Sequence, residues 1–253
     1  MVDWPRGRPG DVGATAHVFV DRLDDTVELA HDDGHHLQRV RRVRAGESIT
    51  AADGYGRWRA FVVDTASAGA VRILATSSIV HEPTLVPGLA VAFALTKGTK
   101  PELAVQKLTE LGVDRIVIVN AARSVARWDA VRAGAAMDRL QRVAREAGAQ
   151  CRRARLPVVD GPVSPGELTK HTGLVVAAPH GVRAQDLAAP REGEWLVAVG
   201  PEGGFDDSEL AGFAAAPRLS LGPFVLRAET AAIAAAAALS TRRTVLPEPL
   251  PGI

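Results

Sequence analysis

The sequence predicts a two-part protein in which a small β-rich region precedes an α/β domain with a parallel sheet. Residues 16–80 consist of short runs of strand length that are separated by turn residues. From residue 89 the pattern changes, and apolar runs of strand length alternate with longer segments of helical periodicity. Because such alternation favours a parallel sheet covered by helices, the second region belongs to the α/β class.

The first region, residues 1–80, is predicted to form a small barrel. Candidate strands lie at 16–20, 26–29, 47–51, 57–64 and 70–80, and residues 53–56 give a hairpin signal. Asp32 and Asp33 are placed to cap a short helix that runs to Val43. Short strands around one helix favour a β-barrel of PUA or OB type, an architecture that often binds RNA. A proline-marked linker, 81–88, follows.

The second region, residues 88–253, is predicted to hold a helix-covered sheet. Strands are expected at 89–95, 115–119, 174–178, 195–199 and 218–221. Helices are expected from Thr99 or Pro101 to Leu111, over 128–149 and over 230–241, with Gly112 as a C-terminal cap. The pattern alone favours an ordinary doubly wound fold, because knots are rare in proteins.

Composition limits the classes of protein that this chain can belong to. With 253 residues, of which 47% are hydrophobic, it can bury a core in one large domain or two small ones. The apolar run 231–239 is too short to span a bilayer, and residues 1–8 lack the apolar stretch of a secretory signal. The single cysteine, Cys151, excludes an internal disulfide, and the seven histidines show no metal-ligand spacing. We therefore expect a cytoplasmic protein without a membrane segment or a metal.

Two clusters of arginine stand out in a chain whose net charge is only +1. Between 120 and 160 there are nine arginines against four acidic residues, and 35–44 holds four arginines and no acid. Local basic patches on a neutral protein fit contact with a phosphate backbone. An equally weighted alternative is that these arginines lie on solvated helix faces.

Two Gly-Pro turns near the C-terminus are the most specific feature of the chain. They lie within 199–205 and 219–223, each directly after a strand-like run, and the second continues into Leu226-Arg227-Ala228-Glu229-Thr230. Glycine lets a backbone approach a ligand closely, and proline fixes φ and removes an amide donor. Rigid loops with few side chains suit the enclosure of a flat, adenosine-like ligand, although a single Gly-Pro turn is ordinary turn chemistry.

Together the two turns and the helix start after them resemble the cofactor loops of the SPOUT methyltransferases. In particular they are similar to the ribosomal RNA small-subunit methyltransferase E family. Further similar blocks lie in the same order, at 36–41, 97–98, 105–113, 123–125 and 139–147, so that the resemblance spans roughly 17–240. The sequence departs from the family pattern at Cys151-Arg152-Arg153 and at Ala104.

The resemblance implies a fold and an activity. It implies a deep trefoil knot in the last third of the chain, with S-adenosylmethionine as cofactor and no metal. The implied reaction is methylation of N3 of a uridine, at position 1498, in the 16S rRNA of the small ribosomal subunit. It also implies a homodimer in which each active site borrows groups from the partner copy.

The resemblance, together with the chemistry of the residues, indicates which residues form the candidate site. Arg227 is the candidate donor to a uracil oxygen, and Glu229 or Glu202 the acceptor of the imide proton; each glutamate could instead only cap helix amides. The predicted cofactor-binding residues are Ala178, Pro179, Val199, Gly200, Pro201, Gly203, Ser220, Leu221, Gly222, Leu226 and Ala228. The predicted RNA-binding residues are His36, Arg39, Arg41, Arg42, Lys97, Lys100 and Arg123.

Three other functions compete with this one. A non-catalytic RNA-binding or ribosome-assembly protein would show no saturable binding of S-adenosylmethionine. A dinucleotide-dependent oxidoreductase is disfavoured because the loop lacks the Gly-x-Gly-x-x-Gly pattern and the acidic residue that follows it. A SPOUT enzyme with another target, such as a ribose 2′-hydroxyl or a tRNA base, shares the fold and is set aside only by the detailed motif match.

Overall fold

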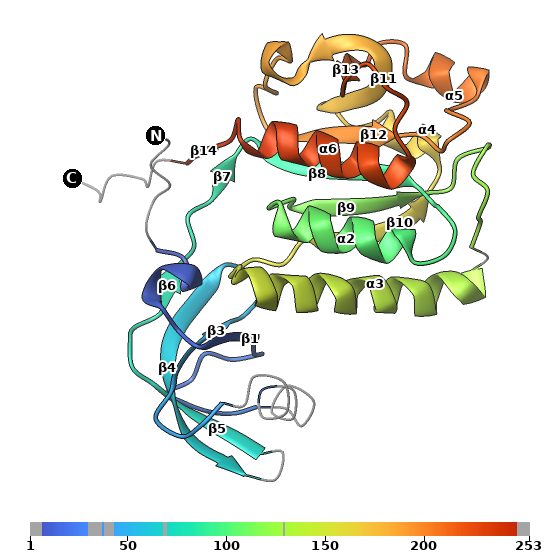
Figure 1. The fold of residues 1–253 in the computed structure, drawn as a ribbon. Coiled ribbons are helices and arrows are strands. Elements are labelled where there is room, and N and C mark those ends of the chain that lie inside the picture. Colours follow the sequence, from blue (N-terminus) through green and yellow to red (C-terminus); the bar gives the residue numbers. More distant parts are fainter. Residues whose placement is uncertain (1–6, 30–36, 38–42, 68–69, 129, 247–253) are drawn as a thin grey trace. The chain divides into compact units, whose positions relative to one another are not determined.

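The computed structural model describes residues 7–29, 37, 43–67, 70–128 and 130–246, which form two compact units (Figure 1). One unit contains residues 1–84 together with 145–156, and the other contains 85–144 and 157–253. The boundaries predicted from the sequence, 1–80 and 88–253, follow chain order and therefore miss the assignment of 145–156 to the first unit. This segment is the end of a long helix and the turn after it, and it packs with the N-terminal strands.

The first unit is built on a six-stranded mixed sheet. Its pairing order is β1-β3-β4-β5-β2, with β6 on β4; β1 and β3 run parallel, and the other neighbours run antiparallel. The predicted helix over 32–43 falls mostly outside the described residues. The elements are the 3-10 turn η1 (Pro9–Val12), β1 (Ala16–Phe19), β2 (Thr26–Glu28), β3 (Ser48–Ala52), β4 (Arg57–Ser67), β5 (Ala70–Ala75) and β6 (Val80–His81).

Apolar cross-strand pairs form the core of this sheet. Ile49 on β3 lies opposite Phe61 on β4, and Val63 on β4 lies opposite Ile73 on β5. All four side chains are buried. Because side chains alternate between the two faces of a strand, the opposite face carries a second buried cluster, which contains Phe19, Ala52 and Trp58.

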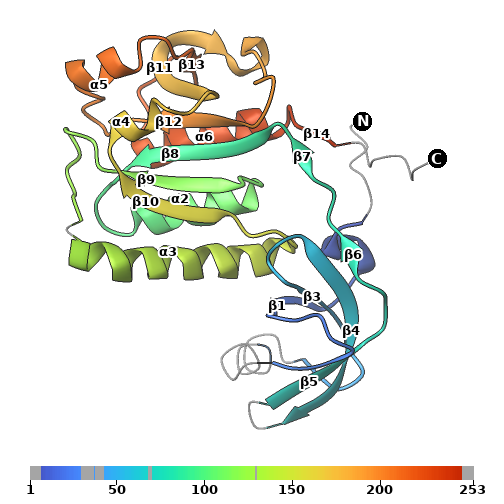
Figure 2. The same cartoon turned by 180° about the vertical axis from the view of Figure 1, so that it is seen from behind.

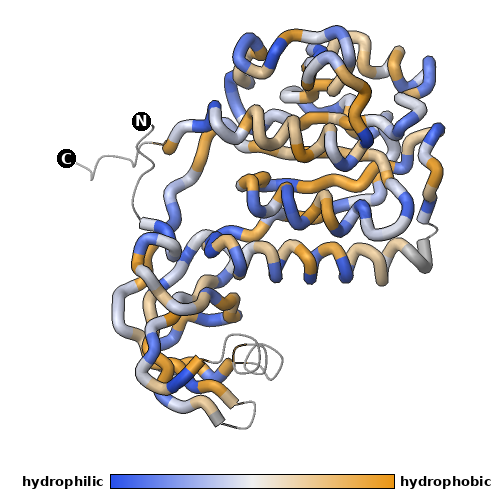
Figure 3. Tube along the Cα trace, viewed as in Figure 1, coloured by the Kyte–Doolittle hydropathy of each residue, from blue (hydrophilic) through white to orange (hydrophobic). Residues whose placement is uncertain are grey.

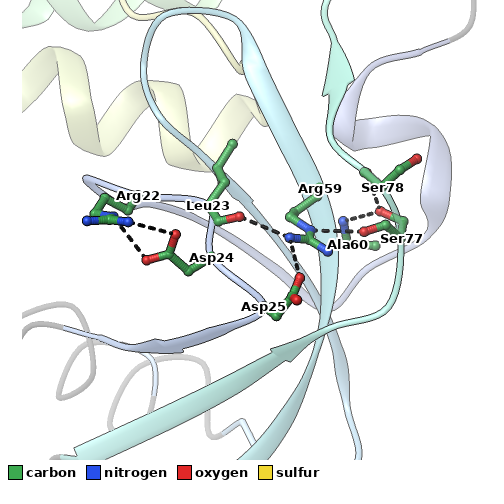
Figure 4. Close-up of polar contacts among 8 residues, drawn as sticks. All are labelled: Arg22, Leu23, Asp24, Asp25, Arg59, Ala60, Ser77 and Ser78. Atoms are coloured by element: carbon green, nitrogen blue, oxygen red, sulfur yellow. Dashed lines mark hydrogen bonds and ion pairs between the residues drawn. The ribbon is translucent and has the colours of Figure 1, made fainter.

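Arg59 ties three segments of the first unit together (Figure 4). Its guanidinium donates hydrogen bonds to the carbonyl oxygens of Leu23 and Ser77, at 3.0 and 2.9 Å, and to the carboxylate of Asp25 at 3.0 Å. The Asp25 side chain is 93% exposed, so this ion pair contributes little to stability. The two carbonyl contacts are the ones that hold the segments after β1 and β5 against β4.

His17 fastens the segment 145–156 to the first unit. Its Nε2 lies 2.9 Å from the carbonyl oxygen of Arg153, and its Nδ1 lies 2.8 Å from Oγ1 of Thr50. Because a carbonyl oxygen only accepts, we assign the ring hydrogen to Nε2, and Nδ1 then accepts from the threonine hydroxyl. Burial lowers the pKa of His17 to about 4, so the ring is neutral at pH 7.

The second unit is a six-stranded parallel sheet, which confirms the predicted α/β class. The strand order is β10-β9-β8-β12-β11-β13. The strands are β8 (Gly88–Ala94), β9 (Arg115–Val119), β10 (Val158–Val163), β11 (Leu174–Arg183), β12 (Glu194–Val199) and β13 (Arg218–Ser220). A short antiparallel pair, β7 (Leu85–Val86) and β14 (Thr244–Val245), lies outside this sheet.

Helices contribute to apolar clusters on both faces of this sheet. Figure 1 shows α6 in front of β8 and β12 and α2 in front of β9 and β10, and Figure 2 shows these strands from behind. α2, α6 and part of α3 share one buried cluster with the strands, and Leu168 of α4 belongs to a second cluster. The helices are α2 (Lys100–Glu110), α3 (Ala130–Cys151), α4 (Pro165–Leu168), α5 (Asp207–Gly212) and α6 (Ala228–Ser240), with a 3-10 turn η3 (Ala184–Asp186).

The sequence of β8 explains its central place. Leu89, Val91 and Phe93 enter the cluster on the α2 and α6 face, whereas the alanines between them enter the other cluster, and all are fully buried. A strand that is buried on both faces has no polar positions, which is typical of parallel sheets covered by helices. Figure 3 shows such hydrophobic colouring along the strands of this unit.

Several elements of the second unit differ from the prediction, among them β10, α4, α5 and the end of β11. β10 contains Gly161 and Pro162, which indicate a loop by composition, but it is an edge strand with a register shift, where proline is tolerated. α4 and α5 have only four and six residues, too few for a helical period to be detected. β11 continues to Arg183, five residues beyond its predicted end, because the strand bulges and then pairs again.

Candidate active site

A cavity of about 530 Å³ lies where β11, β12 and β13 end. The segments that follow β12 and β13 and a bulge within β11 form its walls. The lining residues are Arg123, Val176, Ala177, Ala178, Pro179, His180, Val199, Gly200, Pro201, Glu202, Gly203, Gly204, Phe205, Leu210, Arg218, Leu221, Gly222, Phe224, Val225, Leu226, Ala228 and Ala231. Crevices beyond the carboxyl ends of parallel strands are the usual ligand sites of α/β sheets.

The first wall is the bulge in β11. Ala177 and Val182 both lie opposite Leu219 of β13, so the residues between them leave the ladder and turn toward the cavity. Gly181 permits this detour, because a Cβ atom there would lie 2.4 Å from the carbonyl oxygen of Arg218. Oγ of Ser220 also donates to the carbonyl oxygen of Pro179 at 3.3 Å. The bulge thus presents mainly backbone and small side chains.

The second wall is the loop that follows β12. A turn is closed by the amide of Gly204, which donates to the carbonyl oxygen of Pro201 at 2.8 Å. At Gly200 a Cβ atom would lie 3.2 Å from both the ring and the amide nitrogen of Phe205. Phe205 is buried and makes an edge-to-face contact with Phe213, with ring centroids 5.0 Å apart. The loop therefore packs tightly against its own following residues, and a side chain at Gly200 would require Phe205 to shift by a few tenths of an ångström.

The third wall is the segment after β13. Gly222 has φ +128, a conformation that residues with a side chain rarely adopt, and nothing lies within 4 Å of a Cβ atom built there. Backbone conformation is therefore what favours glycine at this predicted cofactor-binding position. Phe224 and Val225 follow, with exposed fractions of 82% and 91%.

Arg123 and Lys100, both predicted RNA contacts, are engaged with protein groups beside the cavity. Nη1 of Arg123 donates to the carbonyl oxygens of Gly203 and Phe205, at 3.0 and 3.4 Å. Nζ of Lys100 lies 3.7 Å from Oε1 of Glu202 and 3.5 Å from Oε1 of Glu229. Arg123 thus contacts backbone carbonyls of the loop after β12, and Lys100 contacts the side chain of Glu202 in the same loop.

The candidate catalytic residues lie in three different settings. The Glu202 side chain is 40% exposed and lines the cavity. The Glu229 side chain is only 8% exposed, and its Oε2 has no hydrogen-bond partner among the described residues. Arg227 is the N-cap residue of α6 and is exposed. Neither Arg227 nor Glu229 lines the cavity, but Ala228 between them does.

A helix cap anchors the loop from its far side. Asp206 is the N-cap of α5, and its carboxylate accepts from the amide of Glu209 at 2.8 Å. This hydrogen bond, together with one from Ser208, holds the pKa of Asp206 below its usual value. Oε1 of Glu209 in turn accepts from the amide of Ala122 at 2.7 Å. The start of α5 is thereby fixed to the segment after β9 that also carries Arg123.

Most of the predicted cofactor-binding residues come together, although Ser220 is not a lining residue. Sequence reasoning missed Phe205, His180, Arg218 and the pair Phe224–Val225. Phe205 is the last residue of the first turn motif, 199–205, and the pair directly follows the second, 219–223, so counting whole motifs and the two residues after the second would have found them. Arg218 and His180 carry no comparable signal. Lys97 is exposed at the end of β8, whereas His36, Arg39, Arg41 and Arg42 lie outside the described residues.

Two kinds of feature are absent from the described part of the chain. No group of three or more histidine, cysteine, aspartate or glutamate side chains there could hold a metal ion. Nor does any described helix combine the length and apolar character needed to cross a membrane.

Family models match both parts of the sequence. The model described as "RNA methyltransferase domain" matches residues 84–240, and the one described as "RNA methyltransferase PUA domain" matches residues 29–73. The first match covers more than half of the chain and includes every residue that lines the cavity. The second supports the PUA type for the N-terminal region over the OB type.

Individual proteins are similar along most of the chain. The ribosomal RNA small subunit methyltransferase E of Mycobacterium bovis is 39% identical over 237 residues, which cover 87% of this chain and 89% of the relative. Its counterpart from Synechocystis is 32% identical and covers 86% and 74%. The structure of the Neisseria gonorrhoeae enzyme of the same name, bound to S-adenosyl methionine, has a TM-score of 0.77 at 28% identity, covering 90% of this chain and 97% of that one.

These matches agree with the motif-based prediction, because they extend over both regions and over the cavity. They also confirm the predicted resemblance at the level of the family. This chain belongs to the ribosomal RNA small subunit methyltransferase E family.

Proposed function

We propose that this protein transfers a methyl group from S-adenosylmethionine to N3 of a uridine, at position 1498, in the 16S rRNA of the small ribosomal subunit. The observation that carries the proposal is the cavity at the ends of β11, β12 and β13, in a chain of this family. The buried Glu229 and the exposed Glu202 beside it supply candidates for the proton acceptor that the reaction needs.

The residues of the cavity fit S-adenosylmethionine. A volume of about 530 Å³ lies within the range of roughly 300–1,000 Å³ that small-molecule sites occupy. Small residues of the loop after β12 and of the bulge, Gly200, Gly203 and Ala178, line the cavity, so the backbone can approach a ligand closely there. Such walls suit an adenosine, whose flat base requires close approach and whose polar edge requires backbone donors and acceptors. When bound, the cofactor supplies a methyl group on a positively charged sulfur.

The protein's own residues then handle the proton and the developing charge. The N3 imide of uracil must lose its proton before the nitrogen can attack the methyl carbon and the carbon–sulfur bond can break. Glu229 or Glu202 accepts that proton. Arg227, exposed at the start of α6, donates a forked pair of hydrogen bonds to a uracil oxygen as it gains negative charge.

The same proposal includes a knotted fold and a homodimer. In the described residues β12 lies between β8 and β11, and α6 returns from β13 to pack on β8, an order compatible with a trefoil knot in the last third of the chain. Phe224 and Val225 are large, exposed and next to the cavity, which suits coverage by a second copy. A crystallographic chain trace through 174–240 tests the knot. Sedimentation at micromolar concentration tests the dimer, and an active monomer would contradict it.

The RNA partner is expected to be an assembled or nearly assembled small subunit in the cytoplasm. The arginines at 39, 41 and 42 and the exposed Lys97 are the predicted phosphate contacts. A triple alanine variant at those arginines should bind small subunits more weakly and with a flatter dependence of log affinity on log salt. A parental salt slope in the variant would show that these arginines do not contact phosphate.

The decisive experiment measures modified nucleosides in 16S rRNA. Small subunits that lack the modification are incubated with the protein and S-adenosylmethionine, and the digested nucleosides are analysed by mass spectrometry with fragment mapping. The proposal requires N3-methyluridine at one position, dependent on both protein and cofactor. A ribose-methylated nucleoside, a tRNA product or no product would contradict it.

A further inference from the structure

Lys100 occupies a position that a simple phosphate contact does not explain. It begins α2, the helix that follows β8, while Glu202 lies on the loop after β12. β8 and β12 are paired neighbours, with Phe93 opposite Val199, so their carboxyl ends lie side by side. Nζ of Lys100 reaches Glu202 at 3.7 Å and Glu229 at 3.5 Å, and its side chain is 35% exposed. The ammonium therefore joins two acids from different elements.

The two acids differ in what surrounds them. Glu202 is open to solvent and to the cavity, whereas Glu229 is more than nine-tenths buried at the start of α6. Oε1 of Glu229 faces Lys100, but Oε2 is buried without a hydrogen-bond partner among the described residues. A buried carboxylate oxygen without a donor is costly, so a donor is expected to reach it when the site is complete.

We propose that Lys100 is a positioning residue that fixes Glu229 through Oε1 and leaves Oε2 as the atom that accepts the N3 proton of the substrate uracil. This inference rests on the proposed function and deepens it by choosing Glu229 over Glu202. The proton leaves the uracil nitrogen and the new O–H bond forms at Oε2. The nitrogen electron pair would then bond to the methyl carbon as the carbon–sulfur bond breaks and its electron pair goes to the sulfur.

Charge balance explains why two acids share one lysine. Before transfer the cluster holds two carboxylates and one ammonium, a net charge of −1. After Glu229 takes the proton, Lys100 keeps Glu202 as its counter-charge, and the cluster is neutral. Lys100 thus has a carboxylate partner both before and after the proton transfer.

Other charged groups lie near Lys100, Glu202 and Glu229, but none of them takes the place of one of these three residues. Glu102 on α2 is paired with Arg139 of α3 at 3.1 Å, so it is not the partner of Lys100. Lys97 at the end of β8 and Arg227 at the N-cap of α6 are both exposed. The positive end of α6 also favours a negative side chain in its first turn, where Glu229 lies.

The test is a double-mutant cycle on Lys100 and Glu229, measured as single-turnover methylation of small subunits at saturating RNA and cofactor. Glu229→Gln should lower the rate by about 10²–10⁴, the usual contribution of a general base. Lys100→Met should lower it by roughly tenfold or more, because the carboxylate is no longer held in place by the ammonium. The double variant should be no slower than Glu229→Gln, since the lysine acts only through that carboxylate.

Controls separate positioning from folding and from RNA binding. Lys100→Arg should recover much of the lost rate, and all variants should bind the cofactor within about twofold of the parent by calorimetry and melt near its temperature. Lys170→Met, an exposed lysine just before β11, removes the same charge elsewhere and should match the parent.

Three results would overturn the inference while the proposed function stands. In the first, the rate losses of Lys100→Met and Glu229→Gln add up in the double variant. In the second, Glu229→Gln methylates at the parental rate. In the third, Lys100→Met differs from the parent only by a flatter salt dependence of RNA binding. The last result would make Lys100 a phosphate contact. A parent protein that transfers no methyl group would remove both the inference and the proposed function.

Discussion

The guanidinium of Arg123 donates a hydrogen bond to the carbonyl oxygen of Gly203 at 3.0 Å, and this bond connects the segment after β9 to the loop after β12. A second bond from the same nitrogen reaches the carbonyl oxygen of Phe205 at 3.4 Å. An arginine that the sequence assigns to RNA therefore has a partner within the protein. Its position makes it part of the support for the candidate cofactor loop.

Arg123→Ala should weaken binding of S-adenosylmethionine. Hydrogen bonds from a charged donor contribute more than neutral ones, but Arg123 is exposed and solvent reduces the effect, so we expect a loss of about three- to tenfold. Isothermal titration calorimetry measures it, with Arg191→Ala, an exposed arginine before β12, as the matched control. Unchanged cofactor affinity, together with a flatter salt dependence of RNA binding, would show that Arg123 contacts RNA and does not support the cofactor loop.

Gly200→Val should remove detectable cofactor binding while the protein stays folded. A Cβ atom at 200 would lie 3.2 Å from Phe205, and the two further methyl groups of valine must displace that ring or the loop. Overpacking of this kind costs about 1–3 kcal/mol, so the melting temperature should also fall. Calorimetry and a thermal melt measure the two effects. Gly134→Ala on α3, where a Cβ atom meets nothing within 4 Å, is the control. Parental cofactor affinity in a folded Gly200→Val protein would show that this loop does not bind the cofactor.

Arg227→Ala should keep cofactor affinity and lose most turnover. Arg227 is exposed at the start of α6 and does not line the cavity, whereas its neighbour Ala228 does. Loss of one preorganised donor to a developing negative charge typically costs about 10²–10³ in rate. Arg227→Lys should recover little, because a point charge does not reproduce the planar fork. Single-turnover methylation of small subunits measures both variants, and a parental rate in Arg227→Ala would make the residue structural.

The stability of the first unit should depend on pH through His17. Burial lowers its pKa in the folded protein to about 4, below the value of 6.5 for an unperturbed histidine. Between these values the unfolded chain binds more protons than the folded one, so stability is fully present above about pH 6.5 and is lost as the pH falls toward about 4. The expected loss in the free energy of unfolding over this range is roughly 3 kcal/mol, because each unit of pKa difference between the folded and unfolded states corresponds to about 1.36 kcal/mol.

Urea unfolding at a series of pH values measures this dependence. His17→Gln keeps a donor for the carbonyl oxygen of Arg153 but does not titrate, so its stability should fall less between pH 6.5 and 4 than that of the parent. His81→Gln, at an exposed histidine on β6, should behave like the parent. Equal slopes for the parent and His17→Gln would show that His17 is not the group responsible.

The alternation of apolar runs and helical segments is a local property, and it determined the α/β class of the second region. The continuous burial of β8 and the Gly-Pro turns at 199–205 and 219–223 are likewise visible in the sequence, because backbone freedom and hydrophobicity belong to individual residues. The order of the blocks that resemble the family was enough to identify it, and most of the cavity wall follows from the two turns.

Tertiary structure decided what depends on contacts between distant residues. No local pattern shows that 145–156 packs with the N-terminal strands, since His17 and Arg153 meet only after folding. The bulge of β11 depends on Gly181 facing the carbonyl of Arg218, and the two partners of Lys100 lie more than a hundred residues further along the chain. An ion pair across two strand ends depends on which strands are neighbours, and strand order follows from the packing of the whole sheet rather than from the sequence of either strand.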